Sequence, residues 1–224
     1  MLEGGAQPFQ GVSLVDAAAN TAAYSAAAAV ISTLMALPVA FLVTRHPTWA
    51  ARLLERSTYI VMAVPGVVIG FAVSYFIERY LDNSLADTTV PLIGAYAVMF
   101  FPLALVGVRA SVAYAPVGLE EAARSLGQRR FAVLRRVTLP LVGPGLMAAA
   151  CLVFLATATE LTATLILLPG GAQTLASQFW AYQTNLSYGQ AAPFALVMIG
   201  VAAIPSYVLA RFFDRRPSRQ AVAR

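Results

Sequence analysis

Long stretches without a charged side chain limit what this chain can fold into. One runs from residue 17 to 44, and another from 161 to 210, interrupted by a Pro-Gly-Gly turn. A helix that spans a bilayer needs about 20 consecutive apolar residues. A soluble domain, in which about 45–50% of the residues are apolar, has no need of such runs. With 59% apolar residues, the chain is predicted to be an all-α, polytopic membrane protein.

The uncharged runs predict about five transmembrane helices. The expected spans are residues 17–44, 57–77, 89–109, 141–168 and 192–211. Together they define a transmembrane domain at 17–211, with a long charged loop at 110–140. A short segment, 1–16, precedes this domain, and a basic tail, 212–224, follows it.

The arginines predict the orientation of these spans. All 15 basic residues are arginine, and 14 of them fall in segments on one side of the five spans, with Arg79 alone on the other. The positive-inside rule makes the arginine-rich side cytoplasmic. The 1–16 segment is then extracytoplasmic and the C-terminus cytoplasmic. Because no basic region precedes the first span, we expect either a further helix upstream or a chain that is one half of a longer fused protein.

Charge and composition argue against several other classes of protein. The net charge of +5 comes from arginines in loops beside the spans, so we expect contact with membrane lipids and no nucleic acid partner. An intramembrane enzyme would need a Ser-His pair or two acids inside the spans, and the lone His46 lies outside them. Cys151 has no nearby partner in the sequence. We therefore expect no metal site and no catalytic residue.

The stretch EEAARSLGQRRFAVLRRVTLP, residues 120–140, concentrates two glutamates and five arginines in the charged loop. Its first half has apolar residues at the helical spacing i, i+3, i+4 and i+7, namely Leu119, Ala122, Ala123 and Leu126. Gly127 follows, where a helix commonly ends in a left-handed residue. A second apolar set predicts another short helix that closes at Leu139-Pro140: Phe131, Leu134 and Val137. We expect two short amphipathic helices hinged at Gly127 on the cytoplasmic face.

The spacing in this stretch matches the pattern E-A-A-x3-G-x9-hydrophobic-x-L-P at every position, beginning at Glu121 and ending at Pro140. It resembles the cytoplasmic signature of the permease subunits of binding-protein-dependent ABC importers, which usually carry Ile where this chain has Val137. The resemblance covers nearly the whole chain from Asn20 onward. It implies the fold of these permeases, with a cytoplasmic coupling-helix loop.

The resemblance also implies a function and a set of partners. The chain would form the translocation path of an ATP-driven importer in the bacterial inner membrane, as a transport subunit and not an enzyme. ATP and Mg would bind to a dimer of separate ATPase subunits, and no cofactor would bind to this chain. A solute-binding protein outside the membrane and a second permease domain, in a homodimer or a fused half, would complete the importer.

In this family the two short helices dock on the ATPase. The residues expected to form this coupling surface are Glu120, Glu121, Ala122, Ala123, Gly127, Val137, Leu139 and Pro140. Small alanines would permit close approach, and Glu120 or Glu121 would pair with cations on the partner.

Glu160 is the single acidic residue inside an expected span. A charge at the centre of a membrane helix costs about 2.5–3.5 kcal/mol on insertion scales for Asp, Lys and Arg. We therefore expect Glu160 to line the translocation path, on one helical face with Thr157 and Thr164. The alternative is a structural hydrogen bond, or an ion pair at a subunit interface. Pro65-Gly66 is the best candidate for a bend shaped around the path.

The run at 156–195 resembles permeases of the ferric-iron type. It contains E-L-x-A-T-L from Glu160, and T-L-A-x3-W from Thr174, but Thr159 stands where those permeases often carry Lys. Permeases for thiamine and other small solutes share much of this run. We expect ferric iron, with thiamine, a polyamine or another small solute as alternatives. An alternative of another class, an ATP-independent channel or carrier, would not need the docking motif.

Overall fold

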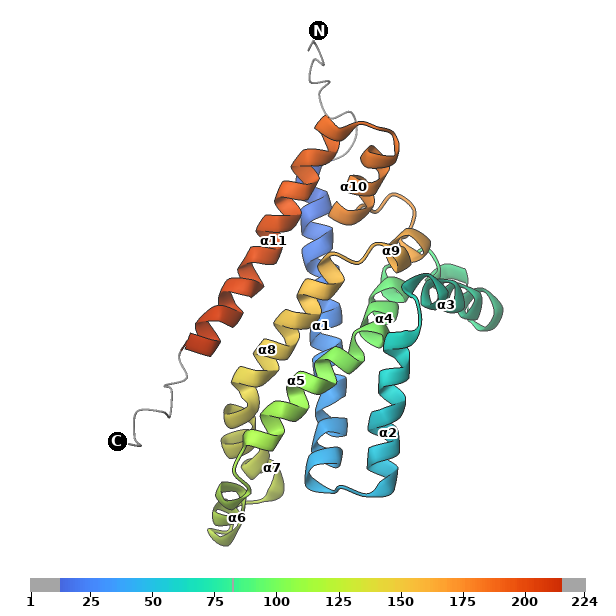
Figure 1. Cartoon of the computed structure of the whole chain (residues 1–224). Coiled ribbons are helices and arrows are strands. Elements are labelled where there is room, and N and C mark those ends of the chain that lie inside the picture. Colours follow the sequence, from blue (N-terminus) through green and yellow to red (C-terminus); the bar gives the residue numbers. More distant parts are fainter. Residues whose placement is uncertain (1–12, 82, 215–224) are drawn as a thin grey trace.

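The computed structural model describes residues 13–81 and 83–214, which form helices and turns without a strand (Figure 1). Of the segment expected at 1–16, only residues 13–16 are described, and the first helix, α1 (Leu14–Arg45), begins there. Of the basic tail expected at 212–224, only residues 212–214 are described. They form the end of the last helix, α11 (Tyr188–Asp214).

Three helices form the centre of the molecule: α1, α5 (Phe101–Tyr114) and α8 (Leu139–Ala158). The residues that α1 buries are mostly alanine, serine and threonine. Small side chains let the backbones of membrane helices approach closely, which strengthens van der Waals packing between them. Gly107 of α5 shows how close the approach is, because a Cβ added there would lie 2.8 Å from the Cβ of Ala149 on α8.

Two of the expected spans are bent. α2 (Trp49–Ile60) continues as a short 3₁₀ turn at Val61–Ala63, and α3 (Gly66–Tyr80) then leaves at an angle of 103°. α4 (Val90–Met99) meets α5 at 54°. With each bent pair counted as one span, the described residues hold five candidate spans by length and composition, the number expected.

The bend between α2 and α3 lies at the predicted Pro65-Gly66. Val64 is extended (ψ 124°), as expected for a residue that precedes proline. The span expected at 57–77 is therefore bent at the predicted position. Figure 1 shows α3 running outward from the end of α2, so that Pro65 turns the chain instead of kinking a helix.

The fourth expected span, 141–168, is also interrupted. α8 ends at Ala158, and a separate short helix, α9 (Thr162–Leu167), follows after three residues. The hydroxyl of Thr159, the residue that ends α8, donates to the backbone carbonyl of Leu155 at 3.2 Å. Such local bonds give the backbone of a Thr-rich segment an alternative to continuing the helix.

The charged loop contains the two short helices that the sequence predicts, α6 (Val117–Ser125) and α7 (Arg130–Val133). The second does not close at Leu139-Pro140, however, because it continues through a π-helical segment at Leu134–Thr138 directly into α8. In that segment the N–H of Leu139 bonds the carbonyl of Leu134. The wider turn accommodates Pro140, which has no N–H to donate.

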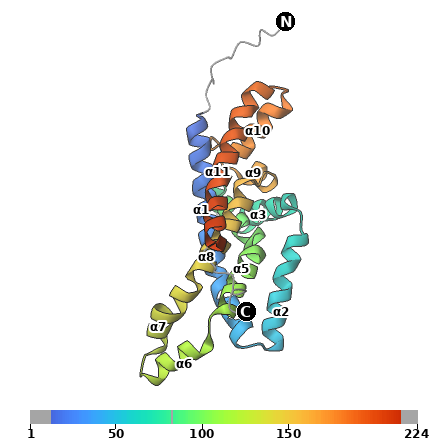
Figure 2. The ribbon, with the colours of Figure 1, turned by 60° about the vertical axis from the view of Figure 1, so that its left-hand side comes forward.

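The remaining elements lie toward the other end of the molecule. α10 (Leu175–Thr184) begins at Thr174, whose side chain forms a capping box with Ser177, and it leads into α11. A short 3₁₀ turn at Asn83–Leu85 joins α3 to α4. Figures 1 and 2 both show α10 at the opposite end from α6 and α7.

The contact between Gly107 and Ala149 gives a test of the central packing. Gly107→Ala should lower the thermal midpoint of the purified protein in detergent, because overpacking a close contact costs about 1–3 kcal/mol. The matched control is Gly94→Ala, since a Cβ at this exposed glycine meets nothing within 4 Å. Equal midpoints for the two variants would contradict the close crossing of α5 and α8.

Candidate functional site

The hinge between α6 and α7 is built around Gly127, whose φ of +77° lies in the left-handed region that favours glycine. Its N–H donates to the carbonyl of Arg124 at 2.9 Å, and the N–H of Gln128 donates to that of Ala123 at 3.2 Å. This pair of bonds is the Schellman motif, which ends a helix and satisfies its last carbonyls. The sequence predicted this turn correctly.

The apolar face of α6 is turned to the outside of the chain. Leu119 is 48% exposed and Leu126 81% exposed, and Phe131, just beyond the hinge, is 74% exposed. Of the other expected coupling residues, Ala123 and Val137 are half-buried, and the following are exposed: Glu121, Ala122, Gly127, Leu139 and Pro140. Exposed apolar side chains grouped beside charged ones are typical of an interaction surface.

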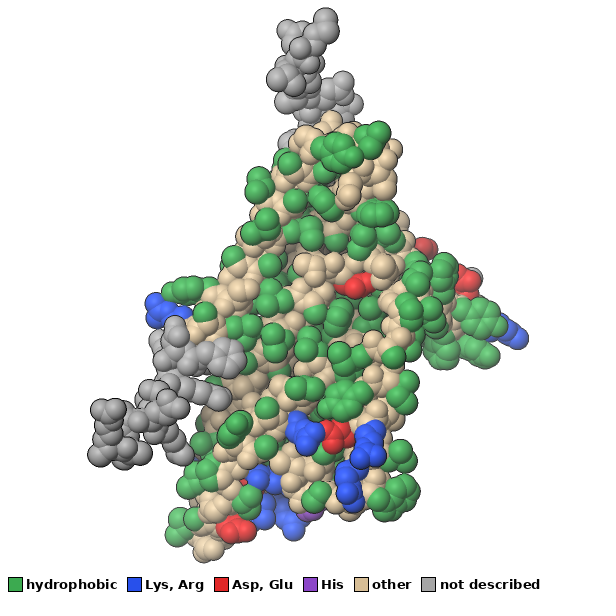
Figure 3. Space-filling view, viewed as in Figure 1, with side chains coloured by type: hydrophobic (Ala, Val, Ile, Leu, Met, Phe, Trp, Pro, Cys, Tyr) green, Lys and Arg blue, Asp and Glu red, His purple; other side chains and the backbone are tan. Residues whose placement is uncertain are grey.

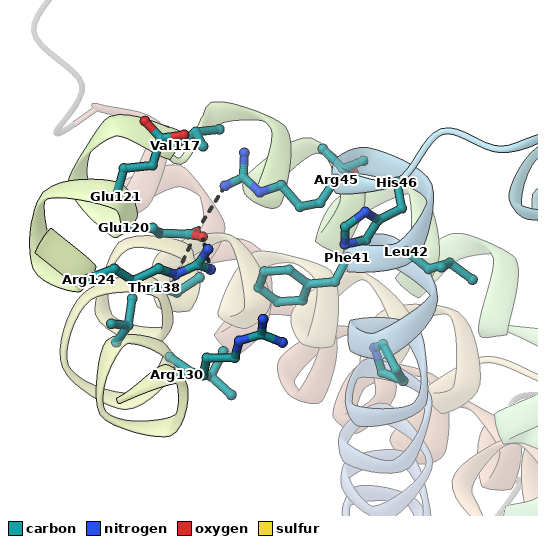
Figure 4. Close-up of a pocket in the computed structure, with 14 residues that line it drawn as sticks. Phe41, Leu42, Arg45, His46, Val117, Glu120, Glu121, Arg124, Arg130 and Thr138 are labelled. Carbon is teal, nitrogen blue, oxygen red and sulfur yellow. Dashed lines mark hydrogen bonds and ion pairs between the residues drawn. The ribbon is translucent and has the colours of Figure 1, made fainter. Parts of the chain in front are cut away.

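Glu120, on the same helix, is turned toward the interior. It is 8% exposed, and its carboxylate accepts hydrogen bonds from Arg45 Nη2 and from the hydroxyl of Thr138, both at 3.2 Å (Figure 4). Arg124, one helical turn later, completes an ion pair at 3.8 Å. The sequence left open whether Glu120 or Glu121 pairs with a cation on a partner; here the carboxylate of Glu120 is buried against groups of its own chain, and Glu121 is exposed.

An open pocket of about 640 Å³ lies beside this carboxylate, between the end of α1 and the α6–α7 hinge (Figure 4). Its charged and titratable lining includes Arg45, His46, Glu121, Arg124 and Arg130. Figure 3 shows that most of the blue arginine side chains gather at this end of the molecule, while green apolar side chains cover much of the rest.

Glu160 occupies the break between α8 and α9, where it caps the second helix. Its Oε1 accepts from the N–H of Thr162 at 2.9 Å, from the hydroxyl of Thr162 at 2.5 Å and from the N–H of Ala163 at 3.2 Å. The first amides of a helix have no partner within the helix, and a carboxylate there also offsets the positive end of the helix dipole. The structural hydrogen bond that the sequence left open as an alternative is thus observed.

The polar stripe expected along one continuous helix is not present, since the helix stops between its members. Thr157 is buried on α8 and donates to the carbonyl of Val153 at 2.9 Å. Thr164 is buried on α9, donates to the carbonyl of Glu160 at 2.6 Å and lies 2.5 Å from the hydroxyl of Tyr96. The break places these two threonines in separate local networks.

The bend at Pro65-Gly66 and the break at Glu160 meet in space. A Cβ added to Gly66 would lie 3.1 Å from Glu160 Oε1 and 2.9 Å from the Cε of Met99, so only glycine fits here without displacing a neighbour. A cavity of about 230 Å³ adjoins this contact. Glu160 and seven apolar residues line it: Val61, Met62, Val64, Ile69, Met99, Phe100 and Leu103.

Several residues at these sites had no signal in the sequence. Arg45 and Thr138 look like ordinary loop residues, and nothing in the sequence joins either of them to Glu120. Glu55 of α2, which is buried, pairs with Arg109 of α5. In the part of the chain that the structure describes, no group of three or more His, Cys, Asp or Glu side chains could hold a metal ion.

The comparisons with known proteins agree on a family. Residues 28–219 match the family described as "Binding-protein-dependent transport system inner membrane component". The Fe(3+)-transport system permease protein FbpB 2 of Haemophilus influenzae is 33% identical over 198 residues, which are 88% of this chain and 39% of that protein. This chain therefore spans well under half the length of that relative.

The molybdenum transport system permease protein ModB of Escherichia coli is 29% identical over 197 residues, which cover 80% of this chain and 86% of that protein. Among solved structures, an inward-facing form of the MetNI methionine ABC transporter has the same fold, with a TM-score of 0.66 at 19% identity over 89% of this chain and 95% of that one. The multi-pass helical fold, the signature on α6 and the match to the family model together place this chain in the family of binding-protein-dependent transport system inner membrane components, the permease components of ABC importers.

Proposed function

We propose that this chain forms the translocation path of an ATP-driven importer of ferric iron. The observation that carries the proposal is the surface on α6, where the E-A-A signature coincides with exposed apolar side chains next to the Gly127 hinge. In this proposal a dimer of ABC ATPase subunits binds ATP and Mg, while this chain binds no cofactor and hydrolyses nothing. Closure of the ATPase dimer moves α6, and the path opens outward.

The proposed docking surface consists of Leu119, Glu121, Ala122 and Leu126, with Phe131 beyond the hinge. Burying these apolar side chains on the ATPase would supply most of the association energy, at about 25 cal/mol for each Å² of apolar surface. Glu121, as an exposed charge at the rim, would add about 0–1 kcal/mol. Shape and apolar contact therefore dominate the proposed interface.

The arginine-rich end is proposed to face the cytoplasm, with the N-terminus outside and the C-terminus inside. The arginines around α6 and α7 would lie near anionic lipid headgroups. A solute-binding protein would dock at the opposite end, where α10 lies (Figure 1).

The proposed path passes the cavity between the bend at Pro65-Gly66 and the break at Glu160. A second permease domain would close its open side. This domain is proposed to belong either to a second copy in a homodimer or to a fused half, since this chain matches 39% of the length of the Fe(3+) relative and 86% of that of the molybdenum relative. Thr157 and Thr164 would act behind the path, by holding the ends of the break.

Ferric iron is the proposed solute because of the relative in the Fe(3+)-transport system and because of the ferric-type run at 156–195. The second candidate is an oxyanion such as molybdate, favoured by the relative in the molybdenum transport system. The remaining alternatives are thiamine, a polyamine or another small solute, which would be carried by the same type of importer.

Uptake by cells tests the proposed solute. Deleting this gene should abolish radiolabelled ferric-ion uptake under iron limitation and leave molybdate and thiamine uptake unchanged, and plasmid-borne wild type should restore it. Loss of molybdate uptake alone would assign the importer to an oxyanion. Ferric-ion uptake that persists after the ATPase partner is inactivated would instead favour an ATP-independent carrier.

The hinge at Gly127 gives a second test. Gly127→Pro removes the N–H that bonds Arg124 and imposes a φ near −65°, so it should abolish uptake while the protein still inserts into the membrane. Gly127→Asn is the matched control, since asparagine tolerates the left-handed conformation, and it should retain most of the uptake. Wild-type uptake by the proline variant would contradict the docking role of this turn.

Glu160 is tested by separating its charge from its capping bonds. Glu160→Gln keeps a carbonyl oxygen that can accept from Thr162 and Ala163, so the variant should fold and bind the ATPase but transport ferric ion several-fold more slowly. Glu160→Ala removes the cap as well and should lower the thermal midpoint, since a lost helix cap costs about 0.5–2 kcal/mol. Wild-type ferric-ion uptake by Glu160→Gln would restrict this residue to capping α9.

A further inference from the structure

The two adjacent glutamates of α6 have opposite environments. Glu121 is exposed on the proposed docking surface, whereas the side chain of Glu120 is 11% exposed. A buried carboxylate is costly unless charges and hydrogen bonds from the protein compensate it. The partners of Glu120 come from separate parts of the chain, so that this one carboxylate connects several helices.

Its strongest partner is Arg45, the last residue of α1 and itself largely buried, with its side chain 17% exposed. One nitrogen of this guanidinium, Nη2, serves two helices at once. It donates to Glu120 Oε1 at 3.2 Å and to the carbonyl of Ala115, the residue that follows α5, at 3.0 Å. Arg45 thus ties the ends of α1 and α5 to the inner side of α6.

The third helix of the centre is reached through Thr138, whose hydroxyl donates to Glu120 Oε1 at 3.2 Å. Thr138 is 2% exposed and is the last residue of the π-helical segment that leads into α8. π-helical turns inside longer helices are frequent at functional positions. We call Glu120, Arg45, Thr138 and the Ala115 carbonyl the Glu120 cluster.

The Glu120 cluster gives α6 a direct connection to α1, α5 and α8, whose buried residues form one packed core. α6 also packs against α7 and the π-helical segment, and it is joined covalently through Pro116 on one side and the Gly127 turn on the other. Such covalent connections are turns that can change conformation. A displacement of α6 would then alter the turns instead of moving the core. A buried, charge-assisted set of bonds resists such a change.

We propose that the Glu120 cluster is the link by which movement of α6 on the ATPase reaches the membrane core. In this role Glu120 is a positioning residue, distinct from Glu121 on the docking surface. The inference rests on the proposed function, in that α6 docks on an ATPase. It assigns to Glu120 the transmission of the movement and not the binding of the partner.

The test uses the complete importer, with the ATPase and the binding protein, reconstituted in proteoliposomes. ATP hydrolysis and ferric-ion uptake are measured on the same sample. Glu120→Gln should assemble with the ATPase and hydrolyse ATP, but the number of ions moved per ATP should fall by roughly 5-fold or more, the lower end of typical coupling between sites. An unchanged ratio would overturn the proposal.

Glu121→Gln is the matched control on the neighbouring residue. It should weaken association with the ATPase while assembled complexes keep the wild-type ratio of ions to ATP. If Glu120→Gln instead behaves like Glu121→Gln, then Glu120 acts in docking and the link is refuted.

Thr138→Val removes a single hydroxyl at nearly constant volume, so it tests the link with the least risk to folding. It should lower the ratio of ions to ATP less than Glu120→Gln does. The double variant Glu120→Gln with Arg45→Gln should lose no more than the worse single variant, because interacting residues are not additive. Additive losses in this double variant would mean that the two residues act separately, contrary to the proposal.

A second readout does not depend on the solute. Cys151, the single cysteine of the chain, lies half-buried on α8 and can carry an environment-sensitive fluorophore. ATP with vanadate should shift its emission in the wild type, and Glu120→Gln should reduce this shift while ATP still binds. If the wild type responds to ATP but moves no ferric ion, the proposed solute fails and the link is judged by the emission alone. An equal shift in the wild type and Glu120→Gln would refute the link.

Discussion

Inside a bilayer, every backbone N–H and C=O that a broken helix releases must find a partner within the protein. This constraint explains the composition of the interruptions in this chain. Where α8 stops, the hydroxyls of Thr157 and Thr159 turn back to the helix carbonyls, and the carboxylate of Glu160 receives the first amides of α9. The single acid of the expected spans thus stands where the backbone needs an acceptor. The break thus leaves irregular backbone beside a cavity, with the first amides of α9 bonded inside the protein.

At the basic end of the molecule, too, single side chains bond groups from more than one helix. Arg45 satisfies a terminal carbonyl of α5 and a buried carboxylate of α6 with one nitrogen, and the pair Glu55–Arg109 joins α2 to α5. Elsewhere the helices are held by contacts between small residues such as Gly107 and Ala149. Ion pairs thus join helices near the basic end, and close packing of small residues holds them elsewhere, as expected for helices that have no hydrophobic driving force to associate within lipid.

The sequence predicted those features that depend on a few neighbouring residues. The number of spans follows from hydrophobicity, the turn at Gly127 from helix-end chemistry and the bend at Pro65 from the missing N–H. The burial of Glu120 could not be predicted, because its partners Arg45 and Thr138 are remote in the sequence and resemble loop residues. The break after Ala158 was missed for a related reason. The apolar residues on both sides of Glu160 look like one helix, and its interruption depends on hydroxyls and a carboxylate whose hydrogen bonds appear only in the fold. The separate surroundings of Thr157 and Thr164 follow from that break.

Successive residues on a helix point about 100° apart, since the helix has 3.6 residues per turn. The two glutamates that open the charged stretch of α6 use this geometry, one turned to the outside and the other to the interior. A substitution on the inner face disrupts the buried ion pair of Glu120 with Arg45, whereas one on the outer face leaves that pair in place. The outer surface of α6 can therefore change without rearranging the core to which its inner face is tied.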